Sequence, residues 1–304
     1  MAGTGVGLKS SRIMKILPVA FDSLGARSMA TYVETKDVRI FIDPGVRVSP
    51  DRYSLPPHKI ELDRLRRMWE EIKKWVLVSD IVIVTHYHYD HHNPDEPEIY
   101  AKKDLFIKHP REFINESQKS RAAYFLEKIE GYPRTINFAD GNSINLGKTK
   151  ITFSPPVYHG VSDRLGYVVL VHIEEDTGFI FSSDVQGPLN KEAVDFIIRN
   201  KPQILIIDGP PTYLLGTYYK KLDIDRAIEN IKKIISETEV KNIIVDHHLP
   251  RDLNWHSYIN PLINIKKKTN IQTAAKFRGE EEELLEARRK DLYDKKVPIV
   301  DNYG

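Results

Sequence analysis

The chain has 304 residues, 41% of them hydrophobic, and its 45 lysine and arginine residues nearly balance 43 aspartate and glutamate residues. This length and apolar content exclude a disordered chain, and the balanced charge gives no argument for a polyanionic partner. Cysteine is absent, which excludes disulfides, thiolate metal sites and a cysteine nucleophile, so any metal must be bound by histidine, carboxylate or water.

No apolar run is long enough to cross a membrane, and the N-terminus lacks the apolar block of a signal peptide. We therefore expect a cytoplasmic protein without a membrane partner. The high density of charge and the small number of glutamines, four in all, are typical of heat-adapted proteins.

The first residues are rich in glycine and serine and show no hydrophobic pattern, so we expect a flexible extension over 1–13 and a single domain over 14–304. Beyond the extension, hydrophobic patterns alternate between the strand and helix periods. Strands are expected at 14–21, 29–34, 38–42, 81–84, 150–153, 167–173, 179–182, 204–207 and 242–245. Helices are expected at 60–76, 112–129, 191–200 and 224–237. This mixture predicts an α/β layered architecture with mixed sheets.

The acidic and basic run at 280–290 (EEEELLEARRK) has the composition of a helix. Its many charges predict a helix whose surface is largely solvated.

The histidines are unevenly distributed. Seven of the eleven fall in three places, each directly after an expected strand: 86–92 (HYHYDHH), His159, and the pair at 247–248. In the loop after 81–84, alternation would send His86 and His88 the same way, so that both imidazoles could reach one ion. If the chain then turns into a helix, Asp90 and His91 would face a neighbouring point.

Two pairs of donors within six residues suggest two metal positions. Imidazole and carboxylate suit a divalent cation where thiolates are absent. A pair of such ions about 3.5–4 Å apart can hold a hydroxide and clamp a scissile group. Contacts with nucleic acid or a pH switch would also explain histidines in a loop, but the full HxHxDH string with further histidines downstream favours metal.

At these residues the sequence resembles the metallo-β-lactamase superfamily. The segment Phe41–Gly45 (FIDPG) is similar to its first motif, and the HxHxDH string matches the second. His159, Asp184 and the 247–248 pair match the third, fourth and fifth motifs in the expected order. The resemblance covers residues 14 to about 255, and it is strongest to an uncharacterised family of short, stand-alone members found mainly in archaea.

The resemblance implies an αββα sandwich: two mixed sheets packed face to face, helices outside, and the site at one edge. It implies two divalent metal ions, zinc first, with manganese and iron also suited. One ion would be held by His86, His88 and His159, and the other by Asp90, His91 and a histidine of the fifth motif, with Asp184 bridging both. Asp90 would also orient the attacking water.

The fifth motif leaves its ligand open between His247 and His248. A pattern of histidine followed four residues later by arginine would pair His247 with Arg251, and strand alternation would point His248 the other way, so His247 is favoured. We expect Asp43 to support a ligand-bearing loop rather than bind metal. His92 is expected to face the substrate or the surface.

Other polar residues at strand ends should lie on the same edge. Asp208 and Tyr213 follow the strand at 204–207, and Arg27 and Ser28 lie between the first two strands. We expect these four residues to line the substrate pocket.

A carboxylate at 184, where penicillin-hydrolysing relatives commonly carry cysteine, argues against a β-lactamase. The leading hypothesis is a dinuclear hydrolase that acts on an ester-type bond of a small molecule or nucleotide, with a phosphodiester preferred over a lactone or thioester. One alternative is a nuclease for RNA or single-stranded DNA, although nothing in the sequence supports nucleic acid directly. Another is a non-catalytic metal-binding scaffold.

Overall fold

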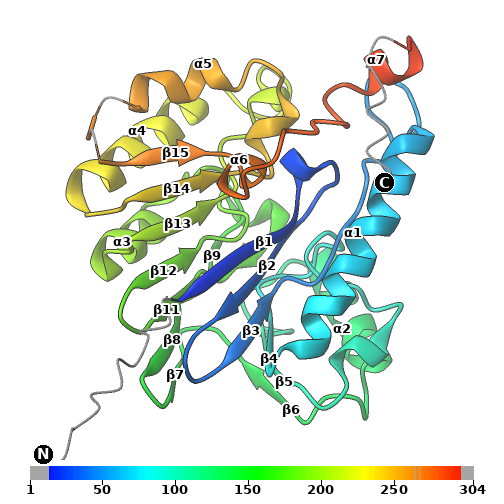
Figure 1. Ribbon diagram of the computed structural model, residues 1–304, viewed down its shortest axis with the longest axis vertical. Coiled ribbons are helices and arrows are strands. Elements are labelled where there is room, and N and C mark those ends of the chain that lie inside the picture. The colour runs from blue at the N-terminus through cyan, green and yellow to red at the C-terminus, as the bar shows by residue number, and fades with distance from the viewer. Residues whose placement is uncertain (1–13, 264, 267, 296–304) are drawn as a thin grey trace, which may run out of the picture.

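The fold of this chain is seen in a computed structural model, which describes residues 14–263, 265–266 and 268–295. The flexible extension expected at 1–13 lies outside the described residues. In the described part, two mixed sheets pack face to face and helices cover their outer surfaces (Figure 1). The expected αββα sandwich is confirmed.

The first sheet is built from the N-terminal part of the chain, in the order β1-β2-β3-β4-β5-β6. Strands β1 to β3 are antiparallel, and β3 to β6 run parallel. Their bounds are Lys15–Phe21, Met29–Glu34, Arg39–Ile42, Ile81–Val84, Asp104–Ile107 and Thr135–Phe138.

The second sheet follows in sequence, with the order β15-β14-β13-β12-β11-β8-β7. Strands β12 to β15 run parallel, and the others are antiparallel. The bounds of β7, β8, β11, β12, β13, β14 and β15 are Ser143–Leu146, Thr149–Phe153, Val171–Glu174, Gly178–Phe181, Ile204–Ile207, Asn242–Val245 and Asn270–Gln272. A separate pair, β9 (Val157–Tyr158) and β10 (Tyr167–Val168), lies beside this sheet.

The helices connect and cover the strands. The α-helices α1 to α7 span Lys59–Val78, Glu116–Lys128, Lys191–Asn200, Lys221–Glu237, His256–Ile259, Ala274–Phe277 and Arg289–Tyr293. The short 3₁₀ helices η1 to η6 span Asp22–Leu24, Pro97–Tyr100, Asp163–Leu165, Thr212–Leu214, Leu249–Arg251 and Asn260–Leu262. None of the helices in the described ranges is long and apolar enough to span a bilayer.

The helix α1 begins at a capping box in which His58 and Glu61 exchange side-chain and backbone hydrogen bonds. It buries Met68, Ile72 and Val76, which recur at the helix period, against the first sheet.

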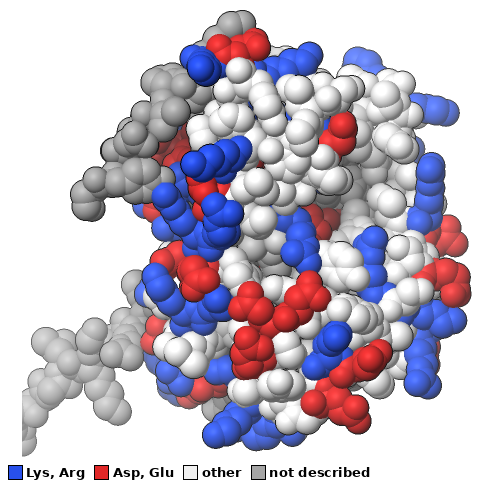
Figure 2. Space-filling model, turned by 90° about the vertical axis from the view of Figure 1, so that its right-hand side faces the viewer, with Lys and Arg blue, Asp and Glu red and all other residues white. Residues whose placement is uncertain are grey.

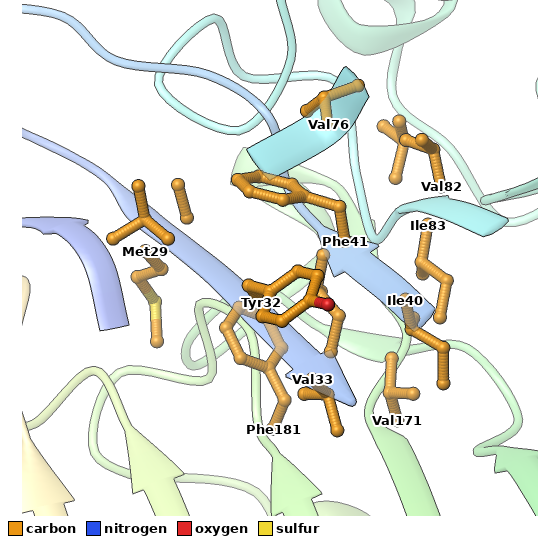
Figure 3. Packing of buried hydrophobic residues seen from close by; sticks show 14 of the residues in the cluster. Met29, Tyr32, Val33, Ile40, Phe41, Val76, Val82, Ile83, Val171 and Phe181 are labelled. Atoms are coloured by element: carbon orange, nitrogen blue, oxygen red, sulfur yellow. The ribbon is translucent and has the colours of Figure 1, made fainter. Parts of the chain in front are cut away.

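The core between the layers follows the alternation of the strands. Tyr32 and Phe41 are opposite each other on β2 and β3 and face α1, where the Tyr32 ring lies 4.5 Å from that of Trp75. Val33 and its neighbour Ile40 face the other way, toward Val171 and Phe181 of the second sheet (Figure 3). On the strands of the second sheet, the residues that alternate with those of the inner face point outward. They pack against α3 and α4.

The apolar strands at 81–84, 204–207 and 242–245 and the helix at 191–200 are confirmed with the expected bounds. The expected strand at 167–173 is divided into β10 and β11. Strands β5, β6, β7 and β15 were not expected from the sequence, because each is only three or four residues long and contains polar side chains, so none forms a wholly apolar run like Ile81–Val84.

The helix expected at 280–290 is wrong for most of its length. Residues 280–288 are not helical, and α7 begins only at Arg289. The segment is also only partly solvated: Glu280 and Glu281 are exposed, but Leu285, Ala287 and Arg289 are buried. Glu283 N donates to the carbonyl of Ser23, Glu286 pairs with Arg27, and Arg289 pairs with Glu61. These contacts with distant parts of the chain hold the segment against the body of the protein, with turns at 285–288.

The parallel strands end at one edge of the sandwich. A histidine or an aspartate follows within three residues of the end of β3 and β4 in the first sheet, and of β12, β13 and β14 in the second sheet. Carboxyl ends of parallel strands commonly form binding sites because the connecting loops gather there.

Candidate metal centre

All eight predicted metal donors lie together at this edge. The loop after β4 supplies four of them, residues 86, 88, 90 and 91. His159 follows β9, Asp184 follows β12, and the histidine pair follows β14. Segments far apart in sequence therefore place their imidazoles and carboxylates around one point.

One group of candidate donors consists of His86, His88, His159 and Asp184, whose ligand atoms all lie within 4.8 Å of one another. Oδ2 of Asp184 is 3.2 Å from Nε2 of His159 and 3.7 Å from Nε2 of His86. All except His88 are buried.

A second group consists of Asp90, His91 and His247. Oδ1 of Asp184 is 3.3 Å from Nε2 of His91 and 3.5 Å from Nε2 of His247. Nε2 of His247 is also 3.6 Å from Oδ2 of Asp90. The two oxygens of Asp184 thus face two different groups of imidazoles.

The donor atoms at the centre of these groups are buried without hydrogen-bond partners. Nε2 of His86, His91 and His159 and Oδ1 of Asp184 are in this state. Buried polar atoms are normally satisfied, and several of them converging on one point without partners are what a cation site requires. The residues present therefore fit divalent metal ions.

The pKa values around the centre are shifted by burial and by the closeness of the imidazoles and carboxylates to one another. Burial lowers the pKa of His88 to about 3, with the neighbouring His159 adding to the effect. Burial would raise the pKa of Asp184, but the imidazoles of His91, His247 and His248 outweigh it and hold that pKa well below its usual value. An ionised carboxylate and neutral imidazoles are the protonation states in which these groups bind metal. Asp184 and His88 have these states, whereas the charge of Asp184 outweighs burial and raises the pKa of His91 and that of His247, the latter to about 9.

Both histidines of the fifth motif point into the centre, so the expectation that His248 points away is wrong. Nε2 of His248 lies 3.8 Å from Oδ2 of Asp184. The reason is that β14 ends at Val245 and the backbone at His247 has a φ of 125°, outside the strand region. Strand alternation therefore no longer applies at this pair.

The second nitrogen of several rings is held by a carboxylate. Nδ1 of His91 donates to Asp43 at 2.7 Å, Nδ1 of His247 to Asp22 at 2.8 Å, and Nδ1 of His248 to Asp208 at 2.8 Å. Such hydrogen bonds fix the ring and its tautomer and leave Nε2 facing the centre.

Each of these carboxylates is itself anchored. Asp43 accepts hydrogen bonds from the backbone and hydroxyl of Thr85, and Asp208 accepts from the backbone of Gln186. Asp22 accepts from Nε of Arg251, whose Nη2 lies 3.1 Å from Nε2 of His247. Arg251 therefore contacts His247, as the sequence spacing suggested.

A cleft of about 740 Å³ opens at the centre, lined by His88, Asp90, His159, Asp184 and His248 among others. Of the four residues expected in the pocket, Arg27 and Tyr213 line it. Ser28 and Asp208 are fully buried instead. Ser28 Oγ donates to the carbonyl of Gly45 at 2.6 Å, and Asp208 lies behind His248.

His92 is neither in the cleft nor at the surface, contrary to expectation. It is fully buried, its ring contacts Phe125 and Tyr87, and its Nδ1 donates to the carbonyl of His88 at 3.0 Å. The helical turn that follows His88 directs this side chain into the core, where it supports the donor-bearing loop.

Several residues of the site were not singled out from the sequence. Asp22 had only its position after β1 to mark it, and Thr85 and Gln186 act through backbone geometry that a sequence does not reveal. The cleft arginines Arg47 and Arg121 lie in segments without any recognised motif.

The chain was compared with known proteins. It is 46% identical over 287 residues to the UPF0282 protein of Korarchaeum cryptofilum, an alignment that covers 92% of this chain and 95% of that one. It is 44% identical over 291 residues to the UPF0282 protein of Methanocaldococcus jannaschii, covering 92% and 96% of the two chains. The sequence matches no family model.

Solved structures resemble the fold at low sequence identity. A possible metal-dependent hydrolase from Veillonella parvula has a TM-score of 0.52 and 13% identity, covering 85% of this chain and 95% of its own. The metallo-β-lactamase fold protein YhfI from Bacillus subtilis has a TM-score of 0.52 and 13% identity, with 86% and 96% covered. The chain thus belongs to the UPF0282 family, and it has the metallo-β-lactamase fold.

Proposed function

We propose that this protein is a dinuclear metal-dependent hydrolase of ester-type bonds, with phosphodiesters preferred over lactones and thioesters. The observation that carries the proposal is the position of Asp184, whose two oxygens face separate groups of buried imidazoles. Two bound divalent cations would supply Lewis-acid polarisation of the scissile group and a water of lowered pKa. Zinc suits this donor set, and manganese and iron do as well.

In this proposal each group of donors holds one ion. His86, His88 and His159 would hold the first, and Asp90, His91 and His247 would hold the second, with Asp184 contributing to both. The choice of His247 rests on its place beside both Asp90 and Asp184.

The remaining polar groups act on the substrate and the water. Asp90 lines the cleft, where its carboxylate accepts a hydrogen bond from a water molecule and orients it toward the scissile group. His248 also lines the cleft, and Asp208 holds its ring with Nε2 facing the centre, where it would contact a bound ester. The buried strands behind Asp184 exclude bulk water from this side.

The preference for a phosphodiester rests on the arginines of the cleft. Planar guanidinium groups bind phosphate oxygens in a bidentate manner, and a neutral lactone or thioester would not use them. The fold shared with a possible metal-dependent hydrolase is compatible with this activity.

The proposal is tested with a panel of bis(p-nitrophenyl) phosphate, a lactone and an acyl thioester, with metal and with chelator. We expect metal-dependent turnover, fastest with the phosphodiester. Hydrolysis of the lactone or thioester alone would contradict the substrate preference. No turnover of any substrate by protein that contains two metal ions would contradict the enzyme and favour a metal-binding scaffold.

Asp90→Asn should lower turnover by roughly a hundredfold or more, because a positioned group that handles a proton contributes about that factor. Metal analysis should still find the first ion, since Asp90 does not belong to its donor group. Asp51 is exposed and precedes α1 in the chain. Asp51→Asn therefore serves as the control and should leave turnover unchanged. Full activity of Asp90→Asn would remove Asp90 from the proposed site.

A further inference from the structure

The cleft next to the candidate metal centre is strongly biased toward positive charge. Within the described residues its lining contains Arg27, Arg47, Arg121, Arg164 and Arg251, and no lysine or glutamate. The acidic lining residues, Asp90 and Asp184, belong to the candidate metal centre. Figure 2 views the side toward which β12 to β14 point in Figure 1, and basic side chains stand beside its hollow.

Two of these arginines are already neutralised. Arg27 forms two hydrogen bonds of 2.6 Å with the carboxylate of Glu286, and Arg251 donates to Asp22 at 2.7 Å. Their charges are largely satisfied within the protein, so they shape the wall of the cleft and contribute little free positive charge.

The other arginines lack such partners. Arg47 lies 3.7 Å from Asp95, whose side chain is 59% exposed, and an exposed pair at that distance contributes little. In the ranges that the structure describes, no ion pair involves Arg121 or Arg164. The cleft therefore presents cationic groups that an anionic ligand could neutralise.

Two of these arginines lie near the same aromatic ring. The guanidinium carbon of Arg47, after β3, lies 5.4 Å from the ring centre of Tyr89, and that of Arg121, on α2, lies 5.2 Å from it. Cation–π attraction offsets only part of the repulsion between like charges. A phosphate group bound beside this ring would lie near both guanidinium groups, and Tyr89 lies between His88 and Asp90 in the chain, next to the donors.

The size of the cleft limits the ligand. A volume of about 740 Å³ is that of a small-molecule site, and the nearly balanced charge of the whole chain gives no argument for a polymeric anion. Tyr213, Tyr218 and Tyr219 line the cleft as well, and of these Tyr218, which is 69% exposed, offers its ring for stacking with a base.

We infer that the substrate is a nucleotide-like phosphodiester with a second phosphate group, which binds beside Tyr89 near Arg47 and Arg121 while the diester lies at the metal centre. This inference rests on the proposed function, since it names the substrate class of the same site. The two arginines determine specificity and do not take part in the chemical step.

The test uses a matched pair of substrates. Thymidine 5′-(p-nitrophenyl phosphate) and its 3′-phosphorylated counterpart share the scissile diester and differ only in the second phosphate. We expect the wild-type protein to prefer the 3′-phosphorylated compound by roughly tenfold or more in kcat/KM, mainly through KM, because a charged hydrogen bond contributes about that factor. Arg47→Gln and Arg121→Gln should each reduce this preference, and the double variant should abolish it.

The control removes a charge from the same helix. Lys119 lies on α2 with its side chain 49% exposed and does not line the cleft, so Lys119→Gln should keep the preference. Arg121→Lys keeps the charge but not the planar donors, and it should retain only part of the preference. Equal rates for the two substrates, or an equal loss in Lys119→Gln, would overturn the inference.

Binding separates this inference from the proposed function. Calorimetry with the metal-loaded protein compares thymidine 3′,5′-bisphosphate with thymidine 5′-monophosphate, without any need for turnover. Tighter binding of the bisphosphate that depends on Arg47 and Arg121 would support the second phosphate site even if no diester were hydrolysed. Hydrolysis without that dependence would support the proposed function and refute this inference, and tighter binding of a single-stranded oligonucleotide would refute the restriction to small ligands.

Discussion

The rings around Asp184 are held by hydrogen bonds from behind. His91, His247 and His248 each present Nε2 to the centre because a carboxylate accepts a hydrogen bond from Nδ1. Gly45 allows this arrangement to be compact: a Cβ atom on it would lie 2.3 Å from the backbone nitrogen of His92. The donors are thus fixed before any ligand enters, which lowers the cost of ordering them on binding.

The two histidines of the fifth motif should respond differently to substitution. His247→Ala removes a donor that faces both Asp90 and Asp184, so we expect it to lower the metal content by one ion per chain. His248→Ala should keep both ions and lose turnover, because in our proposal this ring contacts the substrate. Metal analysis of the purified variants, read with kinetics, distinguishes the two roles, and loss of metal in His248→Ala alone would reverse the assignment.

The sequence predicted which residues meet at the centre, and it missed what holds them. His86, Asp184 and the other donors stand in recognisable spacings at the ends of apolar strands. Asp22 has no such mark, since its partner His247 is 225 residues away and only the tertiary fold joins them. The directions of His92 and His248 were misjudged because they depend on the backbone beyond the strand end.

At the scale of elements, the local hydrophobic pattern predicts a strand correctly where every residue of that strand is buried. The strand β4 (IVIV) is buried at every residue, so its apolar run marks it. The strand β6 is exposed at every residue, and only its pairing with β5 defines it. The helix predicted at 280–290 is wrong over 280–288 for a related reason. The charged side chains of this segment form ion pairs with distant parts of the chain, and these outweigh the helical preference of its composition.

The pairing of Glu286 with Arg27 gives this segment a pH-dependent contribution to stability. Burial alone would raise the pKa of Glu286, but the hydrogen bond and charge of Arg27 outweigh it and lower that pKa to about 2. A carboxylate with a depressed pKa in the folded state stabilises the fold above its unfolded pKa of about 4.3, and this contribution is lost as the pH falls toward 2.

We therefore expect Glu286→Gln to lower the free energy of unfolding at pH 7 by roughly 1.5–3 kcal/mol, measured by urea denaturation. The difference from the wild type should shrink below about pH 4.3. Glu281→Gln in the same segment, where the side chain is 93% exposed, should change stability by less than about 0.5 kcal/mol. A difference that is independent of pH would show that the ion pair is not responsible.

At the scale of the whole molecule, the candidate centre joins the two halves of the sandwich. Four of the eight donors precede β5, and the other four follow β8. Any ion bound between them stabilises the packing of one sheet on the other, because it is bound by the folded state and not by either half alone.

Removal of metal should accordingly lower the thermal stability of the protein. At a free metal concentration about 100 times the Kd, each ion adds about 2.7 kcal/mol to the free energy of unfolding. We expect calorimetric melting to show a higher Tm with zinc than with chelator, and Asp184→Asn to abolish most of the increment. Identical melting of the wild type with and without metal would refute a shared centre between the sheets.

The division of the donors between the two halves of the chain also determines when the centre can form during protein synthesis. The final pair of imidazoles follows β14, so a nascent chain still on the ribosome lacks a complete centre until it has been translated through His248. The first half of the chain contains only the donors that follow β4, and these do not make a complete set of ligands. The pair of ions that we propose can therefore bind only once most of the fold around the centre has been synthesised.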